Sequence, residues 1–270
     1  MPQHSSHKHA PPQHASPRHA LLNNIDHRDL RVVATRGAAW GDAEMAALTF
    51  PAEFRSVQAY YPIVFQKTAD GGFQPVALFG FRQGQNLFLS GDALSRDTLS
   101  GDALSGDALS GEIWEAGYVP LAVERQPFLI GMSADGEPML HIDLAHPRVS
   151  LDQGEALFRT HGGTTDFLDR ATSTLLALHE GTCATPAFID ALLRDELLES
   201  FVLDVELEDG DQHRLAGFYT LHEERLAKLD GAALGQLQRD GHLEPIYMAI
   251  ASLSHFRDLI ERVRRTHVVA

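Results

Sequence analysis

The chain is poor in the residues that mark several common protein classes. Among its 270 residues there is one cysteine, Cys183, so no internal disulfide can form and no CxxC pair points to a zinc ribbon. Its longest apolar runs cover only a few residues, far short of the roughly 20 that cross a bilayer. Lys and Arg number 22 against 37 Asp and Glu, and the formal net charge of −15 would repel a phosphate backbone. We therefore expect neither an integral membrane protein nor a nucleic-acid-binding protein.

Motifs for nucleotide binding and for nucleophilic catalysis are also missing. There is no GxGxxG and no GxxxxGK[ST], the glycine-rich loops that hold phosphates. Residues 131–135, Gly-Met-Ser-Ala-Asp, approach a nucleophile elbow but end in Asp where the elbow requires Gly, which indicates a hairpin turn. The amino-terminal residues contain no apolar segment of the kind found in secretory signals, so we expect a cytoplasmic protein.

Residues 1–20 form a tail of unusual composition. They contain Lys8, Arg18, four prolines and no acidic residue, with almost no large apolar side chain. Such a segment cannot bury enough apolar surface to fold, so we expect it to be disordered. Its neutral imidazoles, some spaced H-x2-H-x-H, suit weak binding of a transition metal. They belong to His4, His7, His9, His14 and His19.

Residues 90–110 repeat a five-residue unit with a leucine at every fifth position, from Leu94 to Leu109. A step of five scatters leucines around a helix and sends them to alternate faces of a strand, and the repeated glycines weaken both forms. Deleting the tract joins NLFLSG to EIW, a continuous strand-turn-strand sequence. We therefore expect an inserted surface loop; a short solenoid-like coil and a calcium site are the alternatives that the pattern leaves open.

Two stretches alternate apolar and polar residues across an Asp-Gly turn, which is typical of a β-hairpin. They cover residues 63–91 and 203–231, and both contain Gly-Phe near the end of the second strand. We interpret them as an internal duplication with halves at about residues 48–150 and 185–266, to which chance similarity is the alternative. A third hairpin is expected to turn at Asp135–Gly136.

Apolar residues at helical spacing predict helices mainly in the second half. Residues 167–181 predict one helix that stops at Gly181, a suitable residue after a helix end. Thr185 as N-cap and Pro186 at the first helical position begin a second helix, so we expect a helical hairpin.

Two further helices complete the expected fold. Residues 253–265 carry an apolar stripe and arginines near the negative end of the helix dipole, and a short helix should begin at Pro51. The chain is therefore predicted to form a single α+β domain over residues 21–266, mainly antiparallel hairpins in the first half and helices concentrated in the second.

His141 and Asp143 are the pair best suited to metal chemistry. Residues two apart on a strand face the same side, and with a remote histidine they would complete a facial triad for Fe(II). His213 and His222 are both candidates for the third ligand, and the predicted metal site consists of His141, Asp143 and His213. The alternative is a polar pair at the solvent face, or a His–Asp hydrogen bond that braces the sheet. Acidic residues near turns are expected to be solvated surface; they are Glu196, Glu199, Asp209 and Asp211.

Several ordered segments together give the chain a family resemblance. They are LTFPAEF (48–54), YPIVF (61–65), PVALFGF (75–81), NLFL (86–89), QPFLIG (126–131), HIDL (141–144), LHEG (178–181), HRLAGFYT (213–220) and YMAIASLS (247–254). By these segments the chain resembles the SapC family of bacterial proteins over residues 21–263, apart from about 91–110.

The resemblance implies a biological context and no catalytic residues. The SapC name derives from surface-array loci, and some relatives are labelled peptide-transport permeases, a label that the short apolar runs do not support here. Members sit beside flavin-dependent halogenase-like proteins, iron-dependent cupin-like hydroxylases and TonB-dependent receptors.

We therefore expect a non-catalytic, cytoplasmic accessory protein of a surface-layer or TonB-type outer-membrane uptake system. It would bind a protein or a small molecule and need no cofactor. The alternative is an Fe(II)-dependent oxygenase or related enzyme that uses the His-x-Asp pair.

Overall fold

The computed structural model describes residues 18–90, 112–133, 135–206 and 212–268. Most of the histidine-rich tail and of the five-residue repeat lie outside these ranges, as do Asp209 and Asp211. Two residues that the sequence assigns to the tail belong to a strand, because His19–Leu21 forms β1 and pairs with β9. The folded region therefore begins before residue 21.

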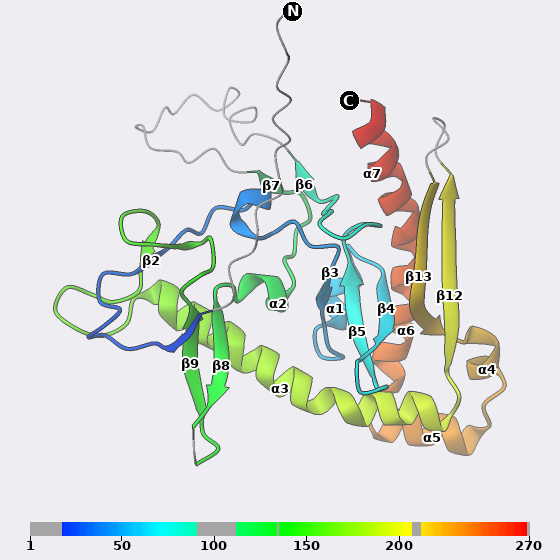
Figure 1. The fold of residues 1–270 in the computed structure, drawn as a ribbon. Helices are drawn as coiled ribbons and strands as arrows, with labels where there is room; N and C mark the ends of the chain where they lie inside the picture. Colours follow the sequence, from blue (N-terminus) through cyan, green and yellow to red (C-terminus); the bar gives the residue numbers. More distant parts are fainter. Residues whose placement is uncertain (1–17, 91–111, 134, 207–211, 269–270) are drawn as a thin grey trace, which may run out of the picture.

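A five-stranded antiparallel sheet with the order β12-β13-β4-β5-β3 has more strands than the other described sheets, and we call it the central sheet (Figure 1). The strands are β3 (Ala46–Leu48), β4 (Ile63–Lys67), β5 (Phe73–Leu78), β12 (Leu198–Glu206) and β13 (Gln212–Leu221). The two predicted hairpins are both present, and they meet where Tyr219 of β13 pairs with Phe65 of β4. Their origin by duplication stays a prediction.

Smaller sheets lie to one side of the central sheet (Figure 1). The third predicted hairpin is confirmed: β8 (Phe128–Met132) and β9 (Pro138–Asp143) pair antiparallel, and Gly136 in the turn has the φ of 81° that glycine adopts without strain. β1 extends this hairpin to three strands. A further sheet has the order β10-β2-β11, with β2 at Arg31–Val32, β10 at Val149–Ser150 and β11 at Glu155–Ala156.

Helices are concentrated in the second half, as predicted. The helices are α1 (Phe54–Val57), α2 (Leu121–Glu124), α3 (Asp166–Arg194), α4 (Glu223–Ala227), α5 (Gly231–Arg239), α6 (Leu243–Ser252) and α7 (Phe256–Val268), with short 3-10 turns at Ala38–Trp40 and Leu253–His255. The helix expected near Pro51 is α1, and the expected C-terminal helix is α7, which buries Leu259 and Val263.

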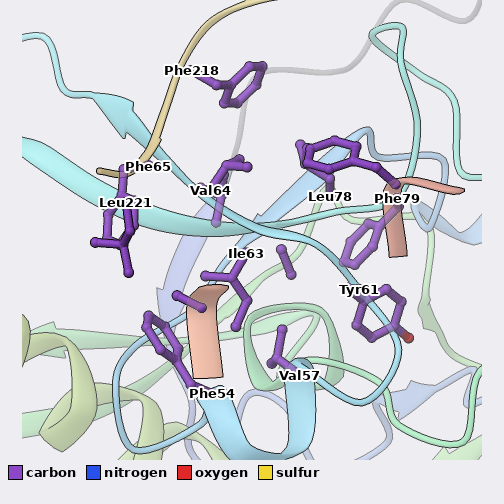
Figure 2. Packing of buried hydrophobic residues seen from close by; sticks show 14 of the residues in the cluster. Phe54, Val57, Tyr61, Ile63, Val64, Phe65, Leu78, Phe79, Phe218 and Leu221 are labelled. Carbon is purple, nitrogen blue, oxygen red and sulfur yellow. The ribbon is translucent and has the colours of Figure 1, made fainter. Parts of the chain in front are cut away.

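Two separate hydrophobic cores stabilise the fold. The larger core lies between the central sheet and helices α1, α3, α6 and α7, and Figure 2 shows Phe54, Tyr61 and Phe65 within it. The smaller core lies under the β8–β9 hairpin and includes Phe128 and Ile142. Helix α3 contributes to both cores and passes from one to the other (Figure 1).

Helix α3 corrects the predicted helical hairpin. It runs without interruption through Gly181 and Pro186, and its N-cap is Thr165, whose side chain accepts from the Leu168 amide. Gly181 is buried against the Phe50 ring, so it serves close packing instead of ending the helix. The Thr185 hydroxyl donates to the Gly181 carbonyl at 2.8 Å, a bond that forms within a helix and not at its start.

Replacing Gly181 by alanine is expected to destabilise the protein, although alanine is the better helix former. A Cβ atom at Gly181 would lie 2.1 Å from Cδ2 of Phe50, whose side chain is buried. Overpacking of this kind costs about 1–3 kcal/mol in unfolding free energy. The matched control is Gly235→Ala in α5, where the nearest atom is the end of the Arg239 side chain and a gain of up to about 1 kcal/mol is expected. Urea unfolding that shows a gain at both positions would contradict the packing argument.

The five-residue repeat connects two strands that pair directly with each other. Leu89 and Ser90 form β6, Ile113 and Trp114 form β7, and the register pairs Leu89 with Trp114 and Ser90 with Ile113. The chain therefore leaves and re-enters the described structure at adjacent points, as the insertion hypothesis requires.

Excising residues 90–109 is expected to leave the melting temperature nearly unchanged, because a surface loop contributes little burial. In the shortened chain Ser110 would take the place of Ser90, and Gly111–Glu112 would form a two-residue hairpin loop with glycine first, a favoured loop type. A calorimetric loss of several kcal/mol would show that the repeat leucines are buried.

Candidate functional site

The structure places the proposed metal ligands on two different sheets. His141 and Asp143 both lie in β9, where Asp143 is paired with His19 of β1, whereas His213 lies in β13 of the central sheet. The side chain of His213 is outside the described structure. Among the residues whose side chains are described, no group of three or more His, Cys, Asp or Glu is arranged to hold a metal ion. The iron site stays a prediction.

Asp143 and His141 each have a local contact. Oδ1 of Asp143 accepts hydrogen bonds from the backbone amides of Arg18 at 2.9 Å and Ala145 at 3.0 Å. This carboxylate therefore connects the residue before β1 with the turn that follows β9. The His141 ring lies over Gly131 of β8, where a Cβ atom would be only 2.5 Å from Nε2. Both contacts brace the sheet.

The other acidic and histidine candidates lie at the surface. The side chain of Glu196 is 75% exposed and lies 3.3 Å from Arg225. Nδ1 of His222, the alternative third ligand, lies 3.7 Å from Glu199 on β12. Glu196 and Glu199 lie at the surface, as the sequence predicts.

A pocket of about 460 Å³ opens between helices α1, α3 and α6, and we call it the helix pocket. It is lined by Pro51, Ala52, Arg55, Gly181, Ala184, Phe188, Gly241, His242, Glu244, Pro245 and Met248. Its volume is within the range of about 300–1,000 Å³ that is common for small-molecule sites. Three of the segments that carry the family resemblance contribute residues to its wall: 48–54, 178–181 and 247–254.

The floor of the helix pocket is apolar and held firmly in place. Phe188 is 1% exposed and meets the Phe54 ring edge-to-face, with a centroid distance of 5.9 Å and an interplanar angle of 83°. On its other side it meets the His242 ring at 5.6 Å. Edge-to-face contacts of this kind fix aromatic rings, so the floor is preorganised.

The mouth of the helix pocket carries one charge of each sign. Arg55 of α1 donates to Glu244 of α6, and their side chains are 73% and 61% exposed. His242 immediately precedes α6, and within the described part of the chain its ring nitrogens have no hydrogen-bond partner. The pocket therefore combines an apolar interior with a polar, electrically balanced entrance.

A buried hydrogen-bond network fixes the helix that carries Arg55. Glu53, the residue before α1, accepts from the Thr49 hydroxyl at 2.7 Å, the Tyr118 hydroxyl at 2.9 Å and the Leu121 amide at 2.7 Å. Burial raises the pKa of Glu53 above its usual value, and these three donors oppose the rise. Burial and the Glu53 carboxylate both raise the pKa of Tyr118, which keeps its phenol a donor.

A second group of polar side chains lies beside the segment that follows β2, and we call Asp42, His146 and Arg148 the junction cluster. Nη2 of Arg148 donates to both oxygens of Asp42, at 2.8 and 2.7 Å, and the side chains are 2% and 0% exposed. Nη1 of Arg148 donates to the carbonyls of Val33 and Thr35. These partners assign Arg148 a structural role.

His146 lies inside the junction cluster as a neutral imidazole. Its Nδ1 accepts from the Arg148 amide at 3.2 Å, and its ring packs against Gly41. Burial lowers the pKa of His146 to about 4, and the Arg148 guanidinium acts in the same direction. The ring is therefore uncharged at neutral pH.

The sequence interpretation missed the helix pocket because its residues come from three distant segments. Arg55 and Glu244 are 189 positions apart, and neither lies in a motif with a known role. The sequence around these residues indicates only that helices begin there, because Pro51 and Pro245 lie at or near helix starts. It does not indicate that α1 and α6 pack against each other.

The structure defines a mixed α+β protein with antiparallel sheets mostly in the N-terminal part and helices concentrated in the C-terminal part. The chain belongs to the SapC family, whose model matches residues 22–99 and 106–259. The interruption of the match, at residues 100–105, lies within the five-residue repeat. No curated protein and no solved structure matches the chain. Within the described residues, every helix is too short or too polar to cross a membrane.

Proposed function

We propose that this protein is a non-catalytic, cytoplasmic binding protein that serves as an accessory component of a surface-layer or TonB-type outer-membrane uptake system. The observation that carries the binding role is the helix pocket, with its rigid apolar floor and its charged mouth. Its lining includes no hydroxyl or thiol group that could act as a nucleophile beside His242. An apolar floor with a charged mouth is suited to holding a small ligand.

The uptake-system part of the proposal depends on family membership. SapC proteins take their name from surface-array loci, and the resemblance implies a setting beside TonB-dependent receptors, which supports the proposal. A binding protein in that setting would hold a compound that the system imports, or would dock a partner protein that handles it.

The test is to identify what co-purifies with the chain and whether it occupies the helix pocket. The variant Ala184→Trp would fill the pocket with an indole ring, because Ala184 lines it. The control is Ala177→Trp, two turns earlier on α3 and also exposed, but not part of the lining. A small molecule or protein that remains bound to the wild type and to Ala177→Trp, and is lost from Ala184→Trp, supports the proposal. Equal recovery from all three proteins contradicts it.

The rival hypothesis is the Fe(II) enzyme based on His141, Asp143 and His213. It is favoured by the position of His141 and Asp143, two residues apart on β9. Metal analysis should use the full chain with glutamine at His4, His7, His9 and His14, since tail histidines would bind metal on their own. Stoichiometric iron that is lost in His141→Ala would overturn the binding-protein proposal, and a folded protein that takes up no iron would overturn the enzyme.

A further inference from the structure

The mouth of the helix pocket selects for the charge of its ligand. Arg55 presents a guanidinium from α1 and Glu244 a carboxylate from α6, and the two groups are directly bonded to each other. A purely anionic ligand would meet Glu244 and the net charge of −15 on the protein. A purely cationic ligand would meet Arg55 at the same place. Only a ligand with both charges pairs with both residues.

The ion pair between Arg55 and Glu244 is easily exchanged for a ligand. Both side chains are more than half exposed, and pairs of this kind contribute little to stability because water screens them. The carboxylate of a zwitterion can replace that of Glu244 on Arg55, where a guanidinium offers two parallel donors. Its ammonium can then replace Arg55 on Glu244. No buried charge is left without a partner.

Behind the charged mouth the pocket is apolar. Ala184 and Met248 supply accessible apolar surface that can cover an aliphatic or aromatic group, and the buried side chains of Phe188 and Pro245 also line the pocket. Met248 adds adaptability, because the unbranched thioether adjusts to groups of different shape. His242 offers ring nitrogens that are free of partners in the described structure, which can bond to a polar group of the ligand.

The geometry points to a small zwitterion with an apolar side group, of the chemical class of the apolar α-amino acids, as the ligand of the helix pocket. Arg55 binds its carboxylate, Glu244 binds its ammonium, and Ala184 with Met248 covers its side group. This inference rests on the proposed binding role of the pocket and specifies its ligand class.

Titration calorimetry with L-leucine tests the ligand class directly. Arg55→Gln and Glu244→Gln are each expected to weaken L-leucine binding about tenfold or more, since each removes one charge-assisted hydrogen bond. The same loss, about tenfold or more, is expected for wild type with L-leucinamide, which lacks the carboxylate, and with N-acetyl-L-leucine, which lacks the ammonium. Glycine, a zwitterion without a side group, should also bind more weakly than L-leucine.

The matched control variant is Arg159→Gln, which breaks an exposed ion pair with Asp166 away from the helix pocket. It should bind L-leucine as the wild type does. No binding of L-leucine, or equal binding by wild type, Arg55→Gln and Glu244→Gln, would overturn the inference. If Ala184→Trp nevertheless loses a co-purified ligand, the binding role stands and only the ligand class fails; if Ala184→Trp changes nothing in that experiment, the binding role itself fails.

Discussion

Replacing Arg148 by methionine is expected to lower the unfolding free energy by about 3 kcal/mol, because the buried carboxylate of Asp42 would lose the partner that bonds both its oxygens and keep only Arg36, whose Nη1 lies 3.4 Å from Oδ1. Both partners are almost completely inaccessible to solvent, and Arg148 Nη2 bonds both oxygens of Asp42. The carbonyls of Val33 and Thr35 would lose a donor in the same change. Urea unfolding, followed by intrinsic fluorescence, measures the loss.

Two further variants separate the buried charge from the lost contacts. In Asp42→Asn with Arg148→Met no charge is buried, and the Asn side chain can still accept from the Gly37 amide as Asp42 does at 2.8 Å. This double variant should recover part of the loss. Arg159→Met, which breaks an exposed pair with Asp166, should cost no more than about 1 kcal/mol. Equal losses for Arg148→Met and Arg159→Met would show that burial of the Asp42 pair is unimportant.

The second large effect is expected on acidification and comes from His146. Burial, with the Arg148 guanidinium acting in the same direction, lowers the pKa of His146 to about 4, whereas an unfolded histidine titrates near 6.5. Between these pH values the unfolded chain binds a proton that the folded chain does not. The stability due to neutral His146 is therefore complete above about pH 6.5 and is lost as the pH falls toward 4, a loss of about 2 kcal/mol once solvent screening of this half-buried ring is counted.

The variant His146→Asn isolates this contribution. The Asn side-chain oxygen can accept from the amide two residues later, as Nδ1 of His146 does from Arg148, but it does not titrate. We expect its unfolding free energy to vary less with pH between 6.5 and 4 than that of the wild type. His161→Asn, at an exposed position, is the control. Parallel pH profiles for wild type and His146→Asn would rule out His146 as the source of acid lability.

The sheet elements could be predicted because their signals are local. Alternation of apolar and polar residues, with Asp-Gly at the turns, gave the three hairpins, since a strand's two faces and a tight turn are specified by neighbouring residues. The same kind of local reading failed in α3. Glycine and proline are common at helix ends, which is why Gly181 and Pro186 suggested a break. Instead, Phe50 packs against Gly181 and Phe188 packs in the larger core, and these contacts stabilise one continuous helix.

The candidate site could not be predicted for a related reason. Arg55 and Glu244 meet only because α1 and α6 pack together, and Asp42 and Arg148 are 106 positions apart. Long-range pairs of this kind leave no periodicity or spacing in the sequence. His141 and Asp143 were recognised because they are two residues apart, which puts both side chains on one face of a strand. The spacing does not tell which residues of other strands lie beside them.

Helix α3 has a mechanical consequence for the whole molecule. With 29 residues it is about 43 Å long, and it places Leu168 and Leu175 in the smaller core while Phe188 and Leu192 lie in the larger one. Neither core can lose its share of this helix without exposing apolar surface, so the two cores should melt together as one cooperative unit. The helix pocket is lined by residues of α3 between its contributions to the two cores. A molecule that binds there is therefore expected to raise the unfolding free energy of both cores together.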